Sequence, residues 1–261
     1  MRAAATATAR PTLRRAALGM AAVAASLCAG RVGSAEVTAP LEYAEYQVKL
    51  GAIPAGTGVM EVRGHAMIDG HDTYHAVLRI TGGLGPAKVD DRFESWLDVK
   101  SWTDHRTVLS RRFTQNQREL SYRRTRTYDF FPERRQYRRA DTGELSALPT
   151  DQPLDDVSMV YYARSLPLAV GATYSIPRYF KADANPVVLK VLRRETITVP
   201  AGTFKTVVVQ PLIKTSGLFG KGGQAELYFT DDAQHTLVQL RSKVSVIGSL
   251  TLQLKRYTPA K

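Results

Sequence analysis

The chain has 261 residues, with 36 lysines and arginines against 24 aspartates and glutamates, which gives a formal net charge of +12 at pH 7. Hydrophobic residues make up 44% of the chain and charged residues 23%, which excludes a disordered tail, while the length excludes a peptide or a disulfide-stapled mini-protein. What remains is one large globular domain or two small ones.

The first 35 residues have the pattern of a secretory signal. Four arginines and no acid open the chain, an apolar run covers residues 16–29, and small residues precede Glu36. The run is too short to span a bilayer comfortably, and the small residues after it are typical of a cleavage site. We therefore expect export to the periplasm by the ordinary secretory route.

Two other forms of this signal are less compatible with the residues. Cys28, the only cysteine, follows Leu27, whereas the lipidation pattern of lipoproteins has a small residue there, so lipoprotein anchoring is not expected. The pair Arg14-Arg15 is followed by residues that fit a twin-arginine signal only weakly. Removal of the leader also removes Cys28, so the rest of the chain has no thiol for catalysis, metal binding or a disulfide.

From Leu41 onward the hydrophobic pattern has a period of two, in segments rich in Val, Ile, Thr, Tyr and Phe that Gly, Pro, Asn and Asp separate. This pattern predicts antiparallel strands with short connections. No βαβ spacing or heptad occurs, which disfavours a parallel sheet and a coiled coil. The predicted strands cover residues 41–50, 56–68, 72–82, 90–100, 106–116, 118–131, 134–140, 172–180, 186–199, 203–214, 223–230, 235–246 and 249–257.

The first internal hairpin turns at Asp69-Gly70. A two-residue turn would place apolar residues of one strand opposite polar residues of the next, such as His71 and His75. An odd loop with Gly70 in a left-handed bulge instead matches apolar residues on both strands, and a one-residue slip moves a whole apolar set to the other face. We therefore expect a bulged turn at Gly70.

One segment breaks the strand pattern and predicts a helix over residues 155–165. Asp155 or Asp156 is a suitable N-cap, and Pro167 follows the last turn. Because only one stripe is apolar, we expect the helix to pack in the concavity of a curved sheet. The turn-rich stretch 141–153 before it is expected to cross between the two halves of that sheet. The stripe has helical spacing at Val157, Val160, Tyr161 and Arg164.

Motifs with a specific chemistry are weak in this chain. His65 and His75, with Asp69 and Asp72 nearby, lack a specific ligand spacing, so we predict no metal site. No Gly-x-Ser-x-Gly elbow occurs, and paired acids such as Asp90-Asp91 point to opposite faces of a strand. These observations favour a protein that is not an enzyme and has no cofactor.

Two glycine clusters, 81–86 and 216–223, are followed by strands rather than by helices. A phosphate loop needs a helix after it, so the clusters are interpreted as flexible connections. Both clusters carry an apolar residue, such as Leu84 in the first, that is placed to gate the mouth of a cavity.

Arginines are concentrated between residues 111 and 139, where ten of them face only three acids. On one strand face Tyr122, Arg124, Arg126 and Tyr128 alternate with outward residues. Arginine beside aromatic rings can bind nucleic acid, but the export signal favours anionic lipid head groups, lipopolysaccharide phosphates or acidic glycans. The alternative is a solvated surface in which the arginines pair with acids across strands.

Three motifs of this chain resemble a bacterial exported family called domain of unknown function 3108. The resemblance covers nearly all of residues 36–261, with one departure at 227–232, where a Trp and a Ser are expected before the Asp. It implies an exported β-rich domain and leaves the activity open. The motifs are Leu41-x-Tyr43-x-x-Tyr46-x-Val48 leading to Gly51 and Gly56, Asp156-x-x-Ser158-x-x-Tyr161-x-x-Arg164-x-Leu166-Pro167-Leu168-x-x-Gly171, and Glu195-x-x-x-Val199-Pro-Ala-Gly-Thr-Phe204.

The central motif permits two interpretations. In the structural one, Asp156 caps the helix, Tyr161 packs inward and Arg164 reaches an acid or the carbonyls at the helix end. In the functional one, Arg164 lies at a cavity mouth and holds an anionic head group.

We therefore predict one mainly β domain over residues 36–261, a large curved antiparallel sheet that forms a half-open barrel with one short helix in its concavity. Such shapes resemble periplasmic carriers and outer-membrane receptors of lipoproteins, which is an analogy of fold alone. It suggests a non-enzymatic periplasmic protein that binds a lipid-like or amphipathic anionic ligand, without nucleic acid and without a transmembrane helix after the leader. The candidate ligand-binding residues are Tyr122, Arg124, Arg126, Tyr128, Tyr161 and Arg164.

Two alternatives remain at this point. The first is an envelope assembly scaffold that docks a protein partner through its arginine-rich strands. The second is a hydrolase that acts on cell-wall or glycan material. An apolar cavity large enough for an acyl chain would favour the carrier. A filled core with an exposed arginine stripe would favour the scaffold, and convergent acids in a cleft would favour the hydrolase.

Overall fold

The computed structural model describes residues 41–85, 87–103, 107–119, 122–213, 225–244 and 248–260. They belong to one unit, Thr38–Lys261. The predicted export signal, residues 1–35, and the second glycine cluster, residues 216–223, lie outside the described residues. Within the described ranges no helix is both long enough and apolar enough to cross a membrane.

The alternating pattern produces strands that all join one antiparallel sheet. The described strands are β1 (Glu42–Leu50), β2 (Ile53–Ile68), β3 (His71–Leu84), β4 (Ala87–Asp98), β5 (Ser110–Glu119), β6 (Tyr122–Phe131), β7 (Gln136–Arg139), β8 (Leu145–Ala147), β9 (Thr173–Ile176), β10 (Val187–Val199), β11 (Gly202–Leu212), β12 (Ala225–Thr230), β13 (Leu237–Val244) and β14 (Gly248–Thr258). Their order in the sheet is β8-β7-β6-β5-β4-β3-β2-β1-β14-β13-β12-β11-β10-β9. Sequence neighbours are therefore sheet neighbours almost throughout, as short hairpin connections predict.

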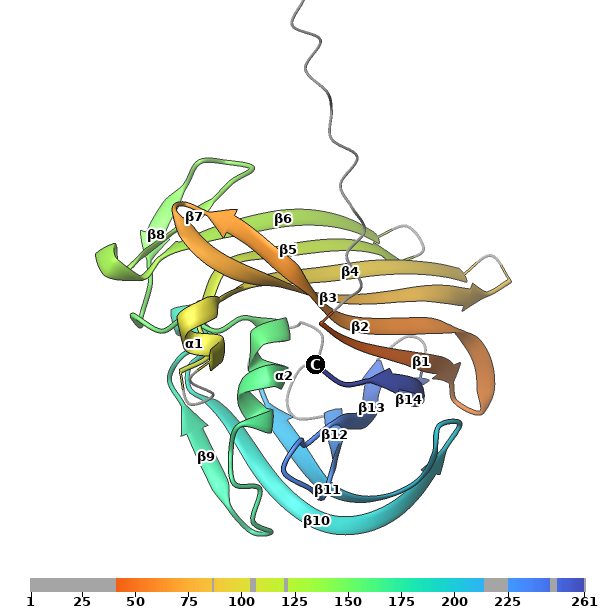
Figure 1. Cartoon of the computed structure of the whole chain (residues 1–261). Coiled ribbons are helices and arrows are strands. Elements are labelled where there is room, and N and C mark those ends of the chain that lie inside the picture. The colour runs from red at the N-terminus through yellow and green to blue at the C-terminus, as the bar shows by residue number, and fades with distance from the viewer. Residues whose placement is uncertain are drawn as a thin grey trace, which may run out of the picture. The chain divides into compact units, whose positions relative to one another are not determined.

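The sheet curves without closing, because β8 and β9 are its two edges and do not pair with each other. Figure 1 shows β2–β6 on one side of the helix α2 (Asp156–Arg164) and β9–β12 on the other. The prediction of a mainly β fold with a large curved antiparallel sheet and a helix in its concavity is confirmed.

The helix α2 begins at a buried N-cap. The side chain of Asp155 accepts hydrogen bonds from the backbone N–H of Val157 (2.8 Å) and Ser158 (2.9 Å), and Ser158 Oγ accepts one from the N–H of Asp155 (2.7 Å). This reciprocal arrangement satisfies N–H groups that the first helical turn leaves without partners. Ser95 Oγ on β4 donates to Asp155 at 2.7 Å, which joins the helix start to the sheet.

The cap is therefore Asp155, and the prediction that Asp156 caps the helix is wrong. Asp156 is the first helical residue, and its carboxylate accepts a hydrogen bond from Tyr179 Oη at 2.8 Å. Burial raises the pKa of Asp155 to about 6, against the lowering effect of its hydrogen bonds from serine hydroxyls and the backbone. Both acids serve to anchor the helix.

An aromatic cluster fills much of the concavity. Phe180 lies 4.9 Å from Tyr128, 5.2 Å from Phe130 and 6.0 Å from Phe113 between ring centroids. These are favourable distances for tilted and edge-to-face contacts. All four rings are at most 2% exposed, so this part of the sheet encloses a packed core rather than a cavity.

The first internal hairpin corrects the predicted register. Ile68 pairs with His71, and Asp69 and Gly70 have φ values of 47° and 81°, so the turn has two residues and no bulge. The register shift lies instead at Gly64, between the pairs Arg63 with His75 and His65 with Tyr74. On the side of the bulge away from the turn, apolar residues of β2 pair with apolar residues of β3, because one extra residue moves the side chains of a strand to the other face.

Some elements differ from the sequence pattern. A short helix, α1 (Val99–Thr103), follows β4, and β8 lies within the stretch that was expected to be a connection. Two 3-10 turns, η1 (Pro132–Arg134) and η2 (Ala182–Ala184), complete the described elements. The predicted strand over 172–180 ends at Ile176, and its remainder leads through Tyr179 and Phe180 into the core.

Candidate functional site

The inward face of the sheet can be followed from strand to strand. Tyr128 lies directly opposite Phe113, and both are buried in the core. Because every second residue of a strand shares a face, Arg124 and Arg126 point to the same side as Tyr128. The arginine-rich strand β6 therefore directs two guanidinium groups toward the concave side.

The ten arginines of residues 111–139 divide into two equal groups. Five form ion pairs: Arg111 with Asp98 and Glu133, Arg112 and Arg138 with Asp129, Arg135 with Asp151, and Arg139 with Asp141. In the described part of the chain the other five have no carboxylate within ion-pair distance: Arg118, Arg123, Arg124, Arg126 and Arg134. Ion pairs therefore account for half of the basic cluster. In the other half, Arg126 lies close enough to Asp141 for its charge to contribute to lowering the pKa of that carboxyl group, after the hydrogen bond from Arg139.

The side chains of Arg124 and Arg126 are half-buried. The guanidinium carbon of Arg124 lies 5.4 Å from the ring centroid of Tyr122, which is 43% exposed. This contact over the ring holds the guanidinium at the surface of the concave face. Tyr128, by contrast, is 2% exposed and belongs to the core, so the structure gives it no free surface for a ligand.

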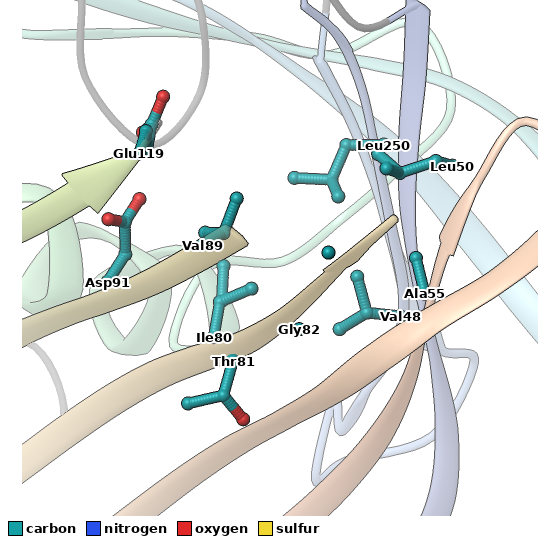
Figure 2. A pocket seen from close by; sticks show the side chains of 11 residues that line it. Val48, Leu50, Ala55, Ile80, Thr81, Gly82, Val89, Asp91, Glu119 and Leu250 are labelled. Carbon is teal, nitrogen blue, oxygen red and sulfur yellow. The ribbon is translucent and has the colours of Figure 1, made fainter. Parts of the chain in front are cut away.

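An apolar pocket lies on the same face, near the ends of β1, β3 and β14. Its volume is about 80 Å³. Figure 2 shows Val48, Leu50, Ala55 and Leu250 on one side of this pocket and Asp91 and Glu119 on the other. The pocket is about half the size of the roughly 150 Å³ apolar cavity that takes up benzene, so it accommodates the end of an alkyl chain and not a whole acyl chain.

Two glycines shape the wall of the pocket. A Cβ on Gly56 would lie 2.0 Å from the carbonyl oxygen of Thr81, and one on Gly82 would lie 2.0 Å from that of Ala55. Gly82 also has φ +154°, which side-chain-bearing residues rarely adopt. Both glycines therefore allow β2 and β3 to approach closely, which explains Gly56 in the first motif and Gly82 in the first glycine cluster.

The polar wall of the pocket is a pair of carboxyl groups. Asp91 is 6% exposed and accepts a hydrogen bond from the backbone N–H of Arg118 at 2.9 Å. Burial, together with a hydrogen bond to Glu119, raises the pKa of Asp91 to about 7. Near neutral pH Asp91 is thus protonated for part of the time and carries less than a full charge.

The pairing register places this pocket beside the two free arginines. Glu119 lies directly opposite Tyr122, and Arg124 is two residues further along β6 on the same face. With strands about 4.8 Å apart and about 3.4 Å per residue, the backbone of Arg124 lies roughly 8 Å from that of Glu119. An elongated molecule can therefore reach from the pocket to Arg124.

Tyr161 and Arg164 lie elsewhere, in a groove of about 660 Å³ at the C-terminal end of α2. Arg164 Nη1 contacts Glu42 Oε1 at 2.7 Å, and Arg164 Nε donates to the carbonyl of Gln234 at 3.3 Å. Glu42 lines the groove at the start of β1 and Val48 lines the pocket near its end, so the two are about 20 Å apart along that strand. The six candidate residues do not form one site.

Among the described residues no group of three or more histidines, cysteines or acids is arranged to hold a metal ion. His65 contacts Asp72 at 2.8 Å, and His75 contacts Glu94 at 2.8 Å. The bulge at Gly64 places the two histidines on opposite faces of the sheet.

Sequence reasoning missed the pocket and its acids. Asp91 was correctly expected to point away from Asp90, but the prediction did not say which of the two faces inward. The available signal was its position between Val89 and Phe93 in an alternating strand, where an inward carboxylate is unusual.

Comparison with known proteins supports the resemblance found in the motifs. The model of the family described as "Protein of unknown function (DUF3108)" matches residues 45–255, so the chain belongs to that family. No curated protein matches the chain. A solved structure titled "Crystal Structure of Beta-barrel-like Protein of Domain of Unknown Function DUF1849 from Brucella abortus" is similar, with a TM-score of 0.44 and 11% sequence identity, over 83% of this chain and 96% of that chain.

Proposed function

We propose that this DUF3108 protein is a non-enzymatic protein of the periplasm that binds an amphipathic anion on the concave face of its sheet. The end of the alkyl chain of the ligand enters the pocket between Val48, Ile80 and Leu250. The anionic group meets Arg124 and Arg126.

One observation carries the proposal. Two arginines that form no ion pair within the described residues share a face with an apolar pocket, Arg124 roughly 8 Å and Arg126 roughly 14 Å from its polar wall. Charged side chains on an inward face are costly to desolvate and are ordinarily paired. A ligand with an apolar end and an anionic end supplies the missing counter-charge and fills the pocket.

The acids between the pocket and the arginines fit the same ligand. Because the pKa of Asp91 is raised to about 7, this carboxyl group is partly neutral under the conditions in which the ligand binds. Repulsion between the acid pair and an anionic head group is reduced accordingly.

The size of the pocket defines the class of ligand. A cavity of about 80 Å³ holds a few terminal carbons, and the rest of the chain then lies along the open face toward Tyr122. We expect the anionic group and the first buried carbons to dominate affinity, with about 0.8 kcal/mol per methylene that leaves water.

The test is isothermal titration calorimetry with octyl sulfonate, whose charge does not change between pH 4 and 9. Methanesulfonate has the anion without the chain, and octyl glucoside has the chain without the anion. We expect octyl sulfonate to bind more tightly than either. R124Q/R126Q is expected to weaken it by at least about tenfold, because each lost charge-assisted hydrogen bond is worth about 1.5 kcal/mol or more.

A control that removes the same charge is available on β5 and β6. Arg118 and Arg123 point to the outer face, so R118Q/R123Q removes the same charge and is expected to change the affinity by less than about twofold. Equal weakening in both double variants would show that only net charge matters and would contradict the proposal. Absence of octyl sulfonate binding to the unmodified protein would contradict it as well.

A further inference from the structure

A second surface lies at the end of the sheet where the pocket opens. In an antiparallel meander the connections alternate between the two ends of the strands, so the strand ends that border the β1–β2, β3–β4 and β5–β6 connections lie at the same end of the sheet, on the right of Figure 1. Large apolar side chains are exposed at all three: Ile53 is 55% exposed, Leu84 37% and Tyr122 43%. We call this surface the tip surface.

Near these apolar side chains, cationic side chains lie on the outer face of the sheet. A shallow groove of about 360 Å³ is lined by Arg79, Lys88, Arg118 and Arg123, with Asp90 as its acid. Asp90 pairs with Arg79 at 3.1 Å. Lys88, Arg118 and Arg123 form no ion pair within the described residues, so three positive charges of the groove are not neutralised inside the chain.

Two of these charges face each other directly. Arg118 is the register partner of Arg123 across the β5–β6 pair. Like charges in directly opposite positions destabilise a sheet, and a structural role would place an acid at one of them. The pair of Arg112 with Asp129, on the same two strands, shows that arrangement. The Arg118–Arg123 pair is instead the arrangement expected of a surface that contacts an external anion.

We propose that the tip surface docks on an anionic lipid bilayer. Aromatic and aliphatic side chains that enter the head-group region, with lysine and arginine beside them, are the combination that binds membrane interfaces. Leu50, Gly82 and Gly83 line the pocket next to the same turns, so docking brings the pocket to the membrane. The inference rests on the proposed function only in assigning the bilayer as the source of the amphipathic ligand.

The test is co-sedimentation with vesicles of phosphatidylcholine alone or with 30% phosphatidylglycerol. We expect binding only to the anionic vesicles, and a strong loss in 0.5 M salt, because salt screens exposed charges. R118Q/R123Q is expected to lower the partition coefficient about 25-fold, about fivefold for each neutralised charge. I53S/L84S is expected to weaken binding without changing its salt dependence.

R134Q/R135Q is the control, because these two exposed arginines lie at the other end of β6. All variants have the same residues 1–40, so any contribution of that segment to vesicle binding is equal in all of them. Differences in binding between the variants therefore come from the substituted surface residues. Equal losses in R118Q/R123Q and R134Q/R135Q, or equal binding to both vesicle types, would overturn the inference. Octyl sulfonate binding by calorimetry needs no vesicle, so that result separates failure of the docking surface from failure of the ligand site.

Discussion

Asp91 provides the sharpest stability prediction, because it is a buried acid that forms no ion pair with any described residue. Its pKa rises from the ordinary value of 3.8 to about 7 on folding, chiefly through burial. The folded state therefore holds a proton more tightly than the unfolded state between these values, and the stability that this group contributes below pH 4 is lost as the pH rises through 7. A shift of about three units corresponds to about 4 kcal/mol.

The substitution Asp91→Asn removes this pH dependence. Asn retains the acceptor for the N–H of Arg118 and supplies an N–H donor to Glu119, so it resembles the protonated acid. We expect the variant to gain stability relative to the unmodified protein as the pH rises, with the gain about 4 kcal/mol larger at pH 8 than at pH 4. Urea denaturation followed by circular dichroism at each pH measures it.

Asp90→Asn is the matched control. Asp90 is the preceding residue, its side chain is 44% exposed on the opposite face, and it pairs with Arg79. Its substitution is expected to change stability by less than about 1 kcal/mol at either pH. A gain for Asp91→Asn that is the same at pH 4 and pH 8 would refute the assignment of a burial-driven shift to this carboxyl group.

Three other predictions follow from the same contacts. Arg164→Met leaves Glu42 buried without its ion pair, so it is expected to lower the free energy of unfolding by about 3–5 kcal/mol in urea denaturation. Gly82→Ala forces a Cβ to within 2.0 Å of the carbonyl of Ala55, and we expect a loss of more than about 1 kcal/mol by the same measurement. Octyl sulfonate is expected to bind more tightly at pH 6 than at pH 8 by calorimetry, because protonation of Asp91 removes negative charge beside the anion, and Asp91→Asn is expected to abolish that difference.

The fold was largely predictable because periodicity reports burial. Strands buried on one face must alternate, and the segment predicted as a helix forms α2. The expectation that only one stripe of it is buried is wrong, because seven of its nine residues are buried. The hairpin at Asp69-Gly70 marks the limit of such reasoning. Matching apolar residues correctly required one extra residue, but the pattern does not say where along the hairpin it lies, and the structure places it at Gly64.

The candidate site was predictable only in part. Alternation correctly put Arg124 and Arg126 on one face, but their status as unpaired charges depends on which acids lie across neighbouring strands. That depends on pairings such as Arg112 with Asp129, whose partners are 17 residues apart in the chain. Tyr161 and Arg164 were predicted as ligand-binding residues because of the central motif. In the structure they lie near the start of β1, whereas the pocket lies near its end.

Methyl NMR with isotope-labelled Ile, Leu and Val in the presence of octyl sulfonate would locate the ligand on the concave face. We expect nuclear Overhauser contacts from the chain end to Val48, Ile80 and Leu250, and their loss in R124Q/R126Q but not in R118Q/R123Q. Contacts to Val108 and Leu166 of the α2 groove instead, or contacts unchanged in R124Q/R126Q, would contradict the proposed function.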